Sequence, residues 1–243
     1  MTNTTANTTE DSPPLDDPTI YRQMVGSLMY LLMTRPDLSF AVNRLCQFMH
    51  SPTQDHWAAL KRVMRYVNGT LQLGLRLTIS SSPVVHAFSD SDWAGCSLDR
   101  KSTAGYAVFL GPNLVSWTSR KQRTVARSST EAEYKALADV AAEVVWVQSL
   151  LLDLGLHCAT TPVLWCDNLG ATYLCSNPVF HARTKHVEVD YHFVRDKVST
   201  GALKVNFVST HDQLADIFTK SLATARFDAL RFKLGVVPCP PSA

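Results

Sequence analysis

Residues 84–119 read VVHAFSDSDWAGCSLDRKSTAGYAVFLGPNLVSWTS. Three short apolar segments in this stretch, VVHAFSD, AGYAVFL and NLVSWTS, are typical of β-strands. Gly111, Pro112 and Asn113 predict a tight turn between the second strand and the third. We therefore expect three consecutive strands in a meander, which the rest of the chain must complete.

The residues after this meander alternate between helix and strand patterns. Residues 130–155 predict a long helix, because apolar residues recur at three- and four-residue steps and Gly155 is a C-terminal stop. The later elements are expected to be a strand at 161–167, helices at 168–177 and 187–200, a strand at 202–210 and a last helix at 212–222. This order predicts an α/β fold, a mixed five-stranded sheet with helices on its faces.

The rest of the chain differs in composition from this region. Residues 1–18 are mostly Asn, Thr, Ser, Pro and Asp and predict a disordered tail. Residues 19–80 predict a small helical segment, and the run Ser80-Ser81-Ser82-Pro83 a linker. We expect the α/β domain at 83–222, and a C-terminal helix with a Pro-rich tail at 223–243. Three short helices are marginal as a free-standing domain, so we expect them to pack on something else.

Composition excludes several classes of protein. With 243 residues, 46% hydrophobic content and a formal net charge of +2, the chain can build a core and is not wholly disordered. Its apolar runs are shorter than the roughly 20 residues of a membrane-spanning helix, and its N-terminus is no secretory signal. The six cysteines form no CxxC pair. We expect reduced thiols in an intracellular protein, cytoplasmic or nuclear, with no membrane partner.

Four carboxylates fall at the ends of the predicted elements. Asp90 and Asp167 end the first and fourth strands, Glu133 lies in the first turn of the long helix, and Asp216 follows the fifth strand. If the first and fourth strands are adjacent and parallel, Asp90 and Asp167 emerge at the same edge of the sheet. Clustered carboxylates repel one another and need a cation, and hard oxygen ligands suit Mg²⁺ or Mn²⁺. Two such ions roughly 4 Å apart would serve in-line phosphodiester cleavage.

Each of these residues also has a structural interpretation. An aspartate after a strand is often a turn former or a helix cap, and a glutamate in a first turn often serves the helix dipole. The coincidence of all four at the right ends of the right elements favours the metal site.

Several long strings carry a resemblance to a known family. They are FSDSDWAG, DRKSTAGYAVFLG, VSWTSRKQRTVARSSTEAEYKAL, LWCDN, RTKHVEVDYHFVRD and DQLADIFTK. The chain resembles, from about Tyr21 to Leu234, the ribonuclease H region of copia-type LTR retrotransposon polyproteins. The resemblance implies a ribonuclease H-like fold and a metal-dependent endonuclease that hydrolyses RNA in RNA–DNA hybrids, with two Mg²⁺ or Mn²⁺ ions.

The resemblance also implies a set of catalytic residues. It places the first aspartate at Asp90, the glutamate at Glu133 and the next aspartate at Asp167. The last aspartate falls on Asp216, and these four carboxylates are the expected metal ligands. His211 matches a loop histidine associated with proton transfer or product release, although the loop to Asp216 is shorter than in cellular ribonucleases H.

Two nearby carboxylates are alternatives. Asp92 shares a strand face with Asp90, so it is a candidate to support the site without holding an ion. Glu131 and Glu133 differ by roughly 200° around a helix, so only one of them faces the metals well. The match of EYKAL to the family favours Glu133.

The segment from Tyr21 to Leu77 resembles the end of the reverse transcriptase region of the same polyproteins. The polymerase box Tyr-x-Asp-Asp does not occur in this sequence, so we expect no polymerase activity. The remainder of a reverse transcriptase polyprotein is an expected partner. The alternative is an inactive transposon-derived fragment that folds and binds nucleic acid without cleaving it.

Basic residues cluster between positions 100 and 130, where no acidic residue occurs. They are Arg100, Lys101, Arg120, Lys121, Arg123 and Arg127. A basic strip beside an acidic metal site fits a phosphate backbone, which the strip would grip while the metals reach the scissile phosphate. We therefore expect these residues to bind the nucleic acid, with a solvated loop face as the alternative.

Overall fold

A computed structural model describes residues 12–80, 84–158, 160–176 and 188–239 of the chain. The described residues divide into two compact units. The sheet unit spans Leu77–Lys220, and the helical unit combines the residues up to Arg76 with those from Ser221 onward. All the residues of the candidate site described below belong to the sheet unit.

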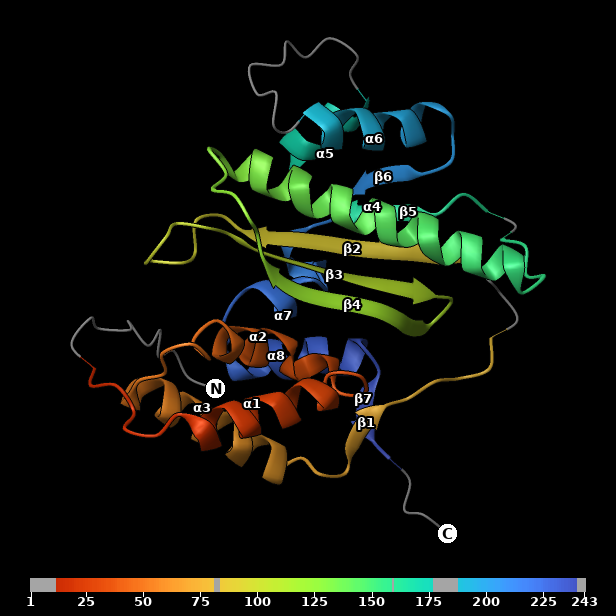
Figure 1. The fold of residues 1–243 in the computed structure, drawn as a ribbon. Coiled ribbons are helices and arrows are strands. Elements are labelled where there is room, and N and C mark those ends of the chain that lie inside the picture. The colour runs from red at the N-terminus through yellow and green to blue at the C-terminus, as the bar shows by residue number, and fades with distance from the viewer. Residues whose placement is uncertain (1–11, 81–83, 159, 177–187, 240–243) are drawn as a thin grey trace. The chain divides into compact units, whose positions relative to one another are not determined.

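A mixed sheet of five strands, in the order β4-β3-β2-β5-β6, forms the centre of the sheet unit (Figure 1). β2 (Val85–Asp92), β3 (Thr103–Leu110) and β4 (Asn113–Lys121) are the expected meander, because each strand pairs antiparallel with the next. β5 (Val163–Cys166) pairs parallel with β2, and β6 (Lys204–Phe207) pairs parallel with β5. These pairings confirm the predicted α/β fold class, a mixed five-stranded sheet flanked by helices.

A long helix covers one face of this sheet. The helices of the sheet unit are α4 (Ser129–Asp153), α5 (Leu169–Ser176), α6 (Glu188–Ser199) and the single turn α7 (Asp216–Thr219). Leu137 and Val140 of α4 share one apolar core with Val85 and Ala87 of β2. Side chains alternate between the two faces of a strand, so this core lies on the face of β2 that carries its odd-numbered residues.

The short α7 packs against the opposite face. Asp90 carries an even number and pairs with Gly105 of β3. A Cβ atom on Gly105 would lie only 2.5 Å from Cβ of Phe218, so the absence of a side chain lets α7 approach the sheet. The helix expected at 212–222 is reduced to this turn, because the extended backbone of Lys220 ends it. A 3₁₀ turn, η2 (Thr210–Asp212), precedes it.

The helical unit has its own core. Its elements are α1 (Thr19–Leu31), the 3₁₀ turn η1 (Pro36–Leu38), α2 (Ser39–Cys46), α3 (Gln54–Asn68), β1 (Leu73–Leu75), α8 (Thr224–Lys233) and β7 (Val236–Pro238). Buried residues from α1, η1, α2 and α3 pack together: Tyr21, Val25, Leu28, Leu38, Val42, Leu45, Leu60 and Val63. The C-terminal segment joins this unit through β7, which pairs antiparallel with β1.

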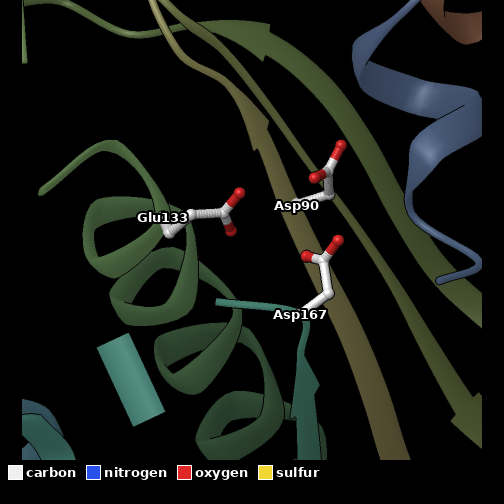
Figure 2. Close-up of side chains that lie close together, drawn as sticks. All are labelled: Asp90, Glu133 and Asp167. Atoms are coloured by element: carbon white, nitrogen blue, oxygen red, sulfur yellow. The ribbon is translucent and has the colours of Figure 1, made fainter. Parts of the chain in front are cut away.

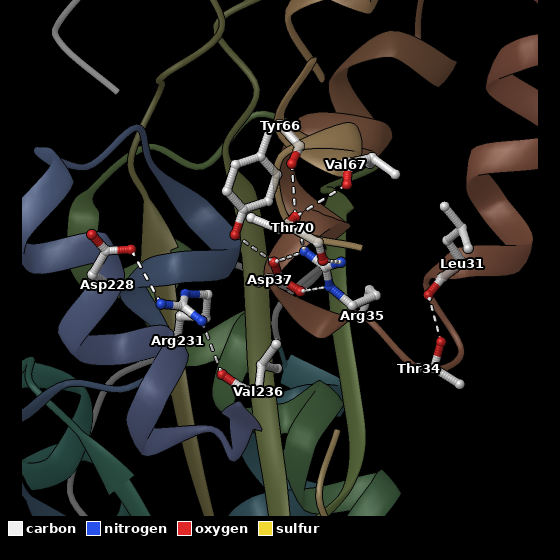
Figure 3. A network of polar contacts seen from close by, with 10 residues as sticks. All are labelled: Leu31, Thr34, Arg35, Asp37, Tyr66, Val67, Thr70, Asp228, Arg231 and Val236. Carbon is white, nitrogen blue, oxygen red and sulfur yellow. Dashed lines mark hydrogen bonds and ion pairs between the residues drawn. The ribbon is translucent and has the colours of Figure 1, made fainter. Parts of the chain in front are cut away.

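A buried ion pair fixes the connection between α1 and α2 (Figure 3). The Arg35 guanidinium donates to both carboxylate oxygens of Asp37, at 2.9 and 2.8 Å. The Tyr66 hydroxyl donates to Asp37 as well, and Arg35 also donates to the backbone carbonyl of Thr70. Each charge in this network therefore has several partners, which is the condition for burying an ion pair at tolerable cost.

Two further observations concern the cysteines and the length of the helices. All six cysteines are free thiols. Across the described ranges, no helix combines the length and the apolar character that crossing a membrane requires.

Candidate metal centre

Asp90 and Asp167 meet at one edge of the sheet. Asp90 lies near the end of β2, and Asp167 comes directly after β5. β2 and β5 are adjacent parallel strands, and Ser89 of β2 pairs with Cys166 of β5. Asp90 and Asp167 are the residues that directly follow this pair. The two strands therefore have the arrangement that brings these carboxylates to one place.

Glu133 reaches this edge from α4. The helix begins at the N-cap Ser128, whose hydroxyl accepts a hydrogen bond from the backbone N–H of Glu131. Glu133, one turn further on, is buried, and its Oε1 accepts from the backbone N–H of Ser91 at 3.2 Å. This bond ties the helix to the end of β2 and aims the carboxylate at Asp90.

The three carboxylates form one cluster (Figure 2). Asp90, Glu133 and Asp167 each offer an oxygen, and these three oxygens lie within 4.8 Å of one another. Two polar side chains orient Asp167: Gln213 donates to its Oδ1 at 3.2 Å, and Thr210 donates to its Oδ2 at 3.1 Å. The segment between β6 and α7 thus holds Asp167 in place.

The cluster is electrostatically unfavourable without a cation. Burial, and then the charges of Asp90 and Asp167, raise the pKa of Glu133 to about 9. Burial is also the main reason that the pKa of Asp90 lies above its ordinary value. A divalent cation would relieve this repulsion, and three hard oxygen donors at this spacing fit Mg²⁺ or Mn²⁺ better than zinc. The chemistry of the donor set therefore fits the expected ion.

Asp216, the fourth expected ligand, has a different setting. It is buried at the start of α7, and its Oδ1 lies 2.7 Å from Nζ of Lys220. The same ammonium lies 3.4 Å from Oδ2 of Asp90, which also accepts a hydrogen bond from the Thr219 hydroxyl. Asp216 is therefore linked to Asp90 by the lysine that both carboxylates contact. The 4.8 Å group itself consists of Asp90, Glu133 and Asp167.

The two alternative carboxylates have structural partners. Glu131 accepts from the backbone N–H of Arg127 at 2.9 Å and pairs with Lys135 at 2.7 Å, so it caps the start of α4. Asp92 accepts from the backbone N–H of Thr103, opposite it on β3. Both contacts fix the backbone around the cluster, and neither residue belongs to the 4.8 Å group.

His211 lies in η2 and faces solvent. Its side chain is 87% exposed, and its Nδ1 lies 3.3 Å from Oδ1 of the adjacent Asp212. The neighbouring Thr210 contacts Asp167, so His211 is close to the cluster along the chain without being packed into it.

The expected nucleic-acid-binding residues lie at the same sheet edge as the cluster. Arg100 and Lys101 precede β3, whose first residue, Thr103, pairs with Asp92 on one side and Lys121 on the other. Arg120 is the residue before the last of β4, while Arg123 and Arg127 lie between β4 and α4. The Trp93 indole donates to the Ala126 carbonyl at 3.0 Å and ties this last loop to the end of β2.

These basic side chains differ in their partners. Asp99, just outside the stretch that lacks acidic residues, lies 2.9 Å from Lys121 and 3.6 Å from Lys101. Arg100, Arg120, Arg123 and Arg127 are exposed. The four arginines are therefore more accessible to solvent than the two lysines.

Besides Thr210, sequence reasoning missed three side chains around the cluster. Gln213 is fully buried and donates to the Ser89 carbonyl as well as to Asp167. Thr219 and Lys220 contact Asp90. All three lie in the string DQLADIFTK, and Lys220 stands four residues after Asp216, a spacing that predicts an ion pair on a helix.

Comparisons with known proteins place the chain among transposon polyproteins. No family model matches it. It is 56% identical over 228 residues to the retrovirus-related Pol polyprotein from transposon RE2 of Arabidopsis thaliana, which is 94% of this chain and 16% of that protein. It is 38% identical over 217 residues to the corresponding polyprotein from transposon TNT 1-94 of Nicotiana tabacum, with shares of 89% and 16%. The chain thus spans about one sixth of these relatives.

Among solved structures, the chain is similar to the N-terminal RNase H domain of a Mycobacterium tuberculosis protein. The identity is 13% and the TM-score 0.42, over 62% of this chain and 98% of that one.

Proposed function

The chain belongs to the retrovirus-related Pol polyproteins of copia-type transposons, and on this premise we propose that it is their ribonuclease H region with the end of the reverse transcriptase. Its proposed activity is metal-dependent hydrolysis of RNA in RNA–DNA hybrids. The observation that carries the proposal is the cluster of Asp90, Glu133 and Asp167 within 4.8 Å. We expect no polymerase activity, because the sequence lacks the Tyr-x-Asp-Asp box.

The side chains of the cluster have distinct tasks in this proposal. Asp90, Glu133 and Asp167 would hold Mg²⁺ or Mn²⁺, with two ions as the expected number and Asp216 as the further ligand. Bound ions of this kind activate water and stabilise the leaving oxygen in phosphodiester cleavage. Gln213 and Thr210 orient Asp167, and the Ser91 N–H orients Glu133, so the carboxylates are positioned before an ion arrives.

The proposed substrate is the RNA–DNA hybrid. Four arginines would bind phosphates at the edge of the sheet where the cluster lies: Arg100, Arg120, Arg123 and Arg127. Lys101 and Lys121 would contribute less, because both pair with Asp99. Discrimination would come from hydrogen bonds to 2′-hydroxyls on one strand and acceptance of deoxyribose on the other. His211, exposed beside the cluster, is proposed to assist proton transfer or product release.

A cleavage assay tests this function. Labelled RNA–DNA hybrid, duplex DNA and duplex RNA are incubated with the chain in Mg²⁺, in Mn²⁺ and in chelator. We expect only the RNA of the hybrid to be cut, and only with metal. Asp90→Asn and Asp167→Asn should each lower the rate by more than the roughly 10–100-fold that losing an outer-shell partner costs, while circular dichroism shows an intact fold. Full activity in either folded variant refutes the site.

The second candidate is a chain that binds the hybrid without cutting it. The observation that favours it is that this chain spans only 16% of the related polyprotein. In that case, holding the hybrid in position for cleavage would depend on the rest of the polyprotein. Measuring hybrid binding and hybrid cleavage separately decides between the two candidates: binding without metal-dependent products supports the second.

A further inference from the structure

Lys220 is a cation built into the edge of the candidate metal centre. Its Nζ lies 2.7 Å from Oδ1 of Asp216 and 3.4 Å from Oδ2 of Asp90. A lysine side chain is ordinarily charged at physiological pH, and here two carboxylates contact its ammonium group.

Asp90 takes part in two different cation positions. With Glu133 and Asp167 it forms the 4.8 Å cluster, and with Asp216 it surrounds the Lys220 ammonium. A divalent ion between Asp90 and Asp216 would have to take the position of the ammonium, which contacts Oδ2 of Asp90 and Oδ1 of Asp216. It would also meet the repulsion of a positive charge a few ångströms away, which is large for a divalent ion even at a water-exposed site.

We propose that Lys220 is a tethered cation that occupies the position between Asp90 and Asp216, so that the free protein binds one divalent ion at the Asp90–Glu133–Asp167 cluster and admits a second only when Lys220 moves away. This inference rests on the metal-binding part of the proposed function and not on cleavage.

The Lys220 side chain can leave the two carboxylates and turn to solvent. Its side chain is 39% exposed, whereas those of Asp90 and Asp216 are 2% and 5% exposed. The lysine lies at the end of α7, where the backbone is already extended, so its side chain can turn to solvent without unwinding a helix. A phosphate group of a bound nucleic acid would offer the ammonium a new anionic partner. Loading of the second ion would then depend on the substrate.

Counting bound Mn²⁺ on the full chain, without nucleic acid, tests the proposal. Electron paramagnetic resonance of free Mn²⁺ reports how many ions each chain binds and how tightly. We expect one ion on the wild type. Lys220→Met should bind a second ion at least about tenfold more tightly than the wild type does, because the competing charge is gone. Lys220→Arg, which keeps the charge, should behave like the wild type.

The chain offers a matched control. Lys135 also pairs with a carboxylate four residues away at 2.7 Å, that of Glu131, outside the cluster. Lys135→Met should leave Mn²⁺ binding unchanged. Adding Asp216→Asn to Lys220→Met should abolish the second ion, which locates it. If Lys220→Met does not fold, Lys220→Gln removes the charge and keeps an amide donor for Asp216.

The outcomes separate this inference from the proposed function. If the neutral Lys220 variants bind Mn²⁺ in the same number and with the same affinity as the wild type, Lys220 is not a competitor and the inference fails. The same conclusion applies if the wild type and the variants all bind two ions, or if none of them binds any. Hybrid cleavage is measured on the same preparations. A chain that gains the second ion as expected but cuts no hybrid overturns the nuclease proposal and leaves the role of Lys220 standing.

Discussion

Glu131 and Glu133 stand two positions apart on α4, and their surroundings give the two carboxylates different tasks. Glu133 belongs to the cluster and accepts from the Ser91 N–H. Glu131 accepts from the Arg127 N–H and pairs with Lys135. At the scale of single residues, the proposed chemistry therefore depends on Glu133, whereas Glu131 stabilises the start of α4.

This difference predicts opposite effects of the same substitution. Glu133→Gln should remove Mn²⁺ binding and metal-dependent hybrid cleavage, because it takes a charged ligand from the cluster. Glu131→Gln should keep both, since glutamine still accepts at a helix start, and should cost at most about 1 kcal/mol of stability. Metal titration and thermal unfolding of the two variants check this. Loss of Mn²⁺ binding in a folded Glu131→Gln chain would contradict the assignment.

The raised pKa of Glu133 predicts a pH-dependent stability of the metal-free chain. The folded state keeps the Glu133 carboxyl protonated up to a pKa of about 9, whereas the unfolded state releases that proton near 4.5. The stability that this proton contributes is fully present below pH 4.5 and is lost as the pH rises through 9. We expect the unfolding temperature in chelator to fall between about pH 6 and pH 9, and Glu133→Gln to flatten the decline.

Metal should reverse this trend, because the ion binds the ionised carboxylates of the folded state. Mg²⁺ should therefore raise the unfolding temperature more at about pH 8.5 than at about pH 6. Glu131→Gln serves as the control and should keep the wild-type slope. Identical pH profiles for Glu133→Gln and the wild type in chelator would show that Glu133 does not carry the effect.

At the scale of elements, the close approach of α7 to β3 brings Asp216, Thr219 and Lys220 to Asp90. The approach depends on Gly105, where a Cβ atom would lie 2.5 Å from Cβ of Phe218. The Ser119 hydroxyl of the next strand donates to the Phe218 carbonyl at 2.6 Å and fixes the turn. The position of one short turn thus sets the surroundings of a cluster built by other elements.

Gly105→Ala should therefore disturb both stability and site. Overpacking of this kind costs about 1–3 kcal/mol, and the displaced α7 should weaken the contact of Lys220 with Asp90. Chemical denaturation measures the first effect and Mn²⁺ titration the second. Gly26, inside α1, is a matched control because a Cβ there meets nothing within 4 Å. Gly26→Ala should stabilise the protein by about 0.5–1 kcal/mol. An unaffected Gly105→Ala chain would mean that α7 has room to adjust.

The sequence predicted the large elements of the sheet better than it predicted this turn. Apolar periodicity over 84–119 and 130–155 gives the meander and α4, and the parallel pairing of β2 with β5 then brings Asp90 and Asp167 together. The apolar pattern at 212–222 suggests a helix, but the buried Gln213 and the extended Lys220 confine it to one turn. Contacts between distant segments decide such a turn, and local periodicity does not report them.

At the scale of the whole molecule, the sheet unit places opposite charges along one edge. The acidic cluster lies where β2 and β5 end, and the basic residues at positions 100–101 and 120–127 lie where β2 ends, β3 begins and β4 ends. Asp99 offsets part of the positive charge by pairing with Lys121 and Lys101. A formal net charge of only +2 for the chain therefore conceals a local separation of opposite charges, which supports the proposal of a polyanionic substrate.

This arrangement predicts which basic residues set the salt dependence of hybrid binding. The double variant Arg123→Gln, Arg127→Gln should lower the slope of log K against log salt concentration by about 1 for each phosphate that is no longer neutralised, hence by up to about 2. Lys121→Gln should change it less, because Asp99 already pairs with that ammonium. Lys204 is exposed at the start of β6, where β5 also starts, and so lies at the end of the sheet away from the cluster. Lys204→Gln should therefore leave the slope unchanged. Fluorescence anisotropy of labelled hybrid in chelator measures all four chains without cleavage. Equal slopes for the wild type and the double arginine variant would move the nucleic acid away from this edge and leave the basic residues as a solvated surface.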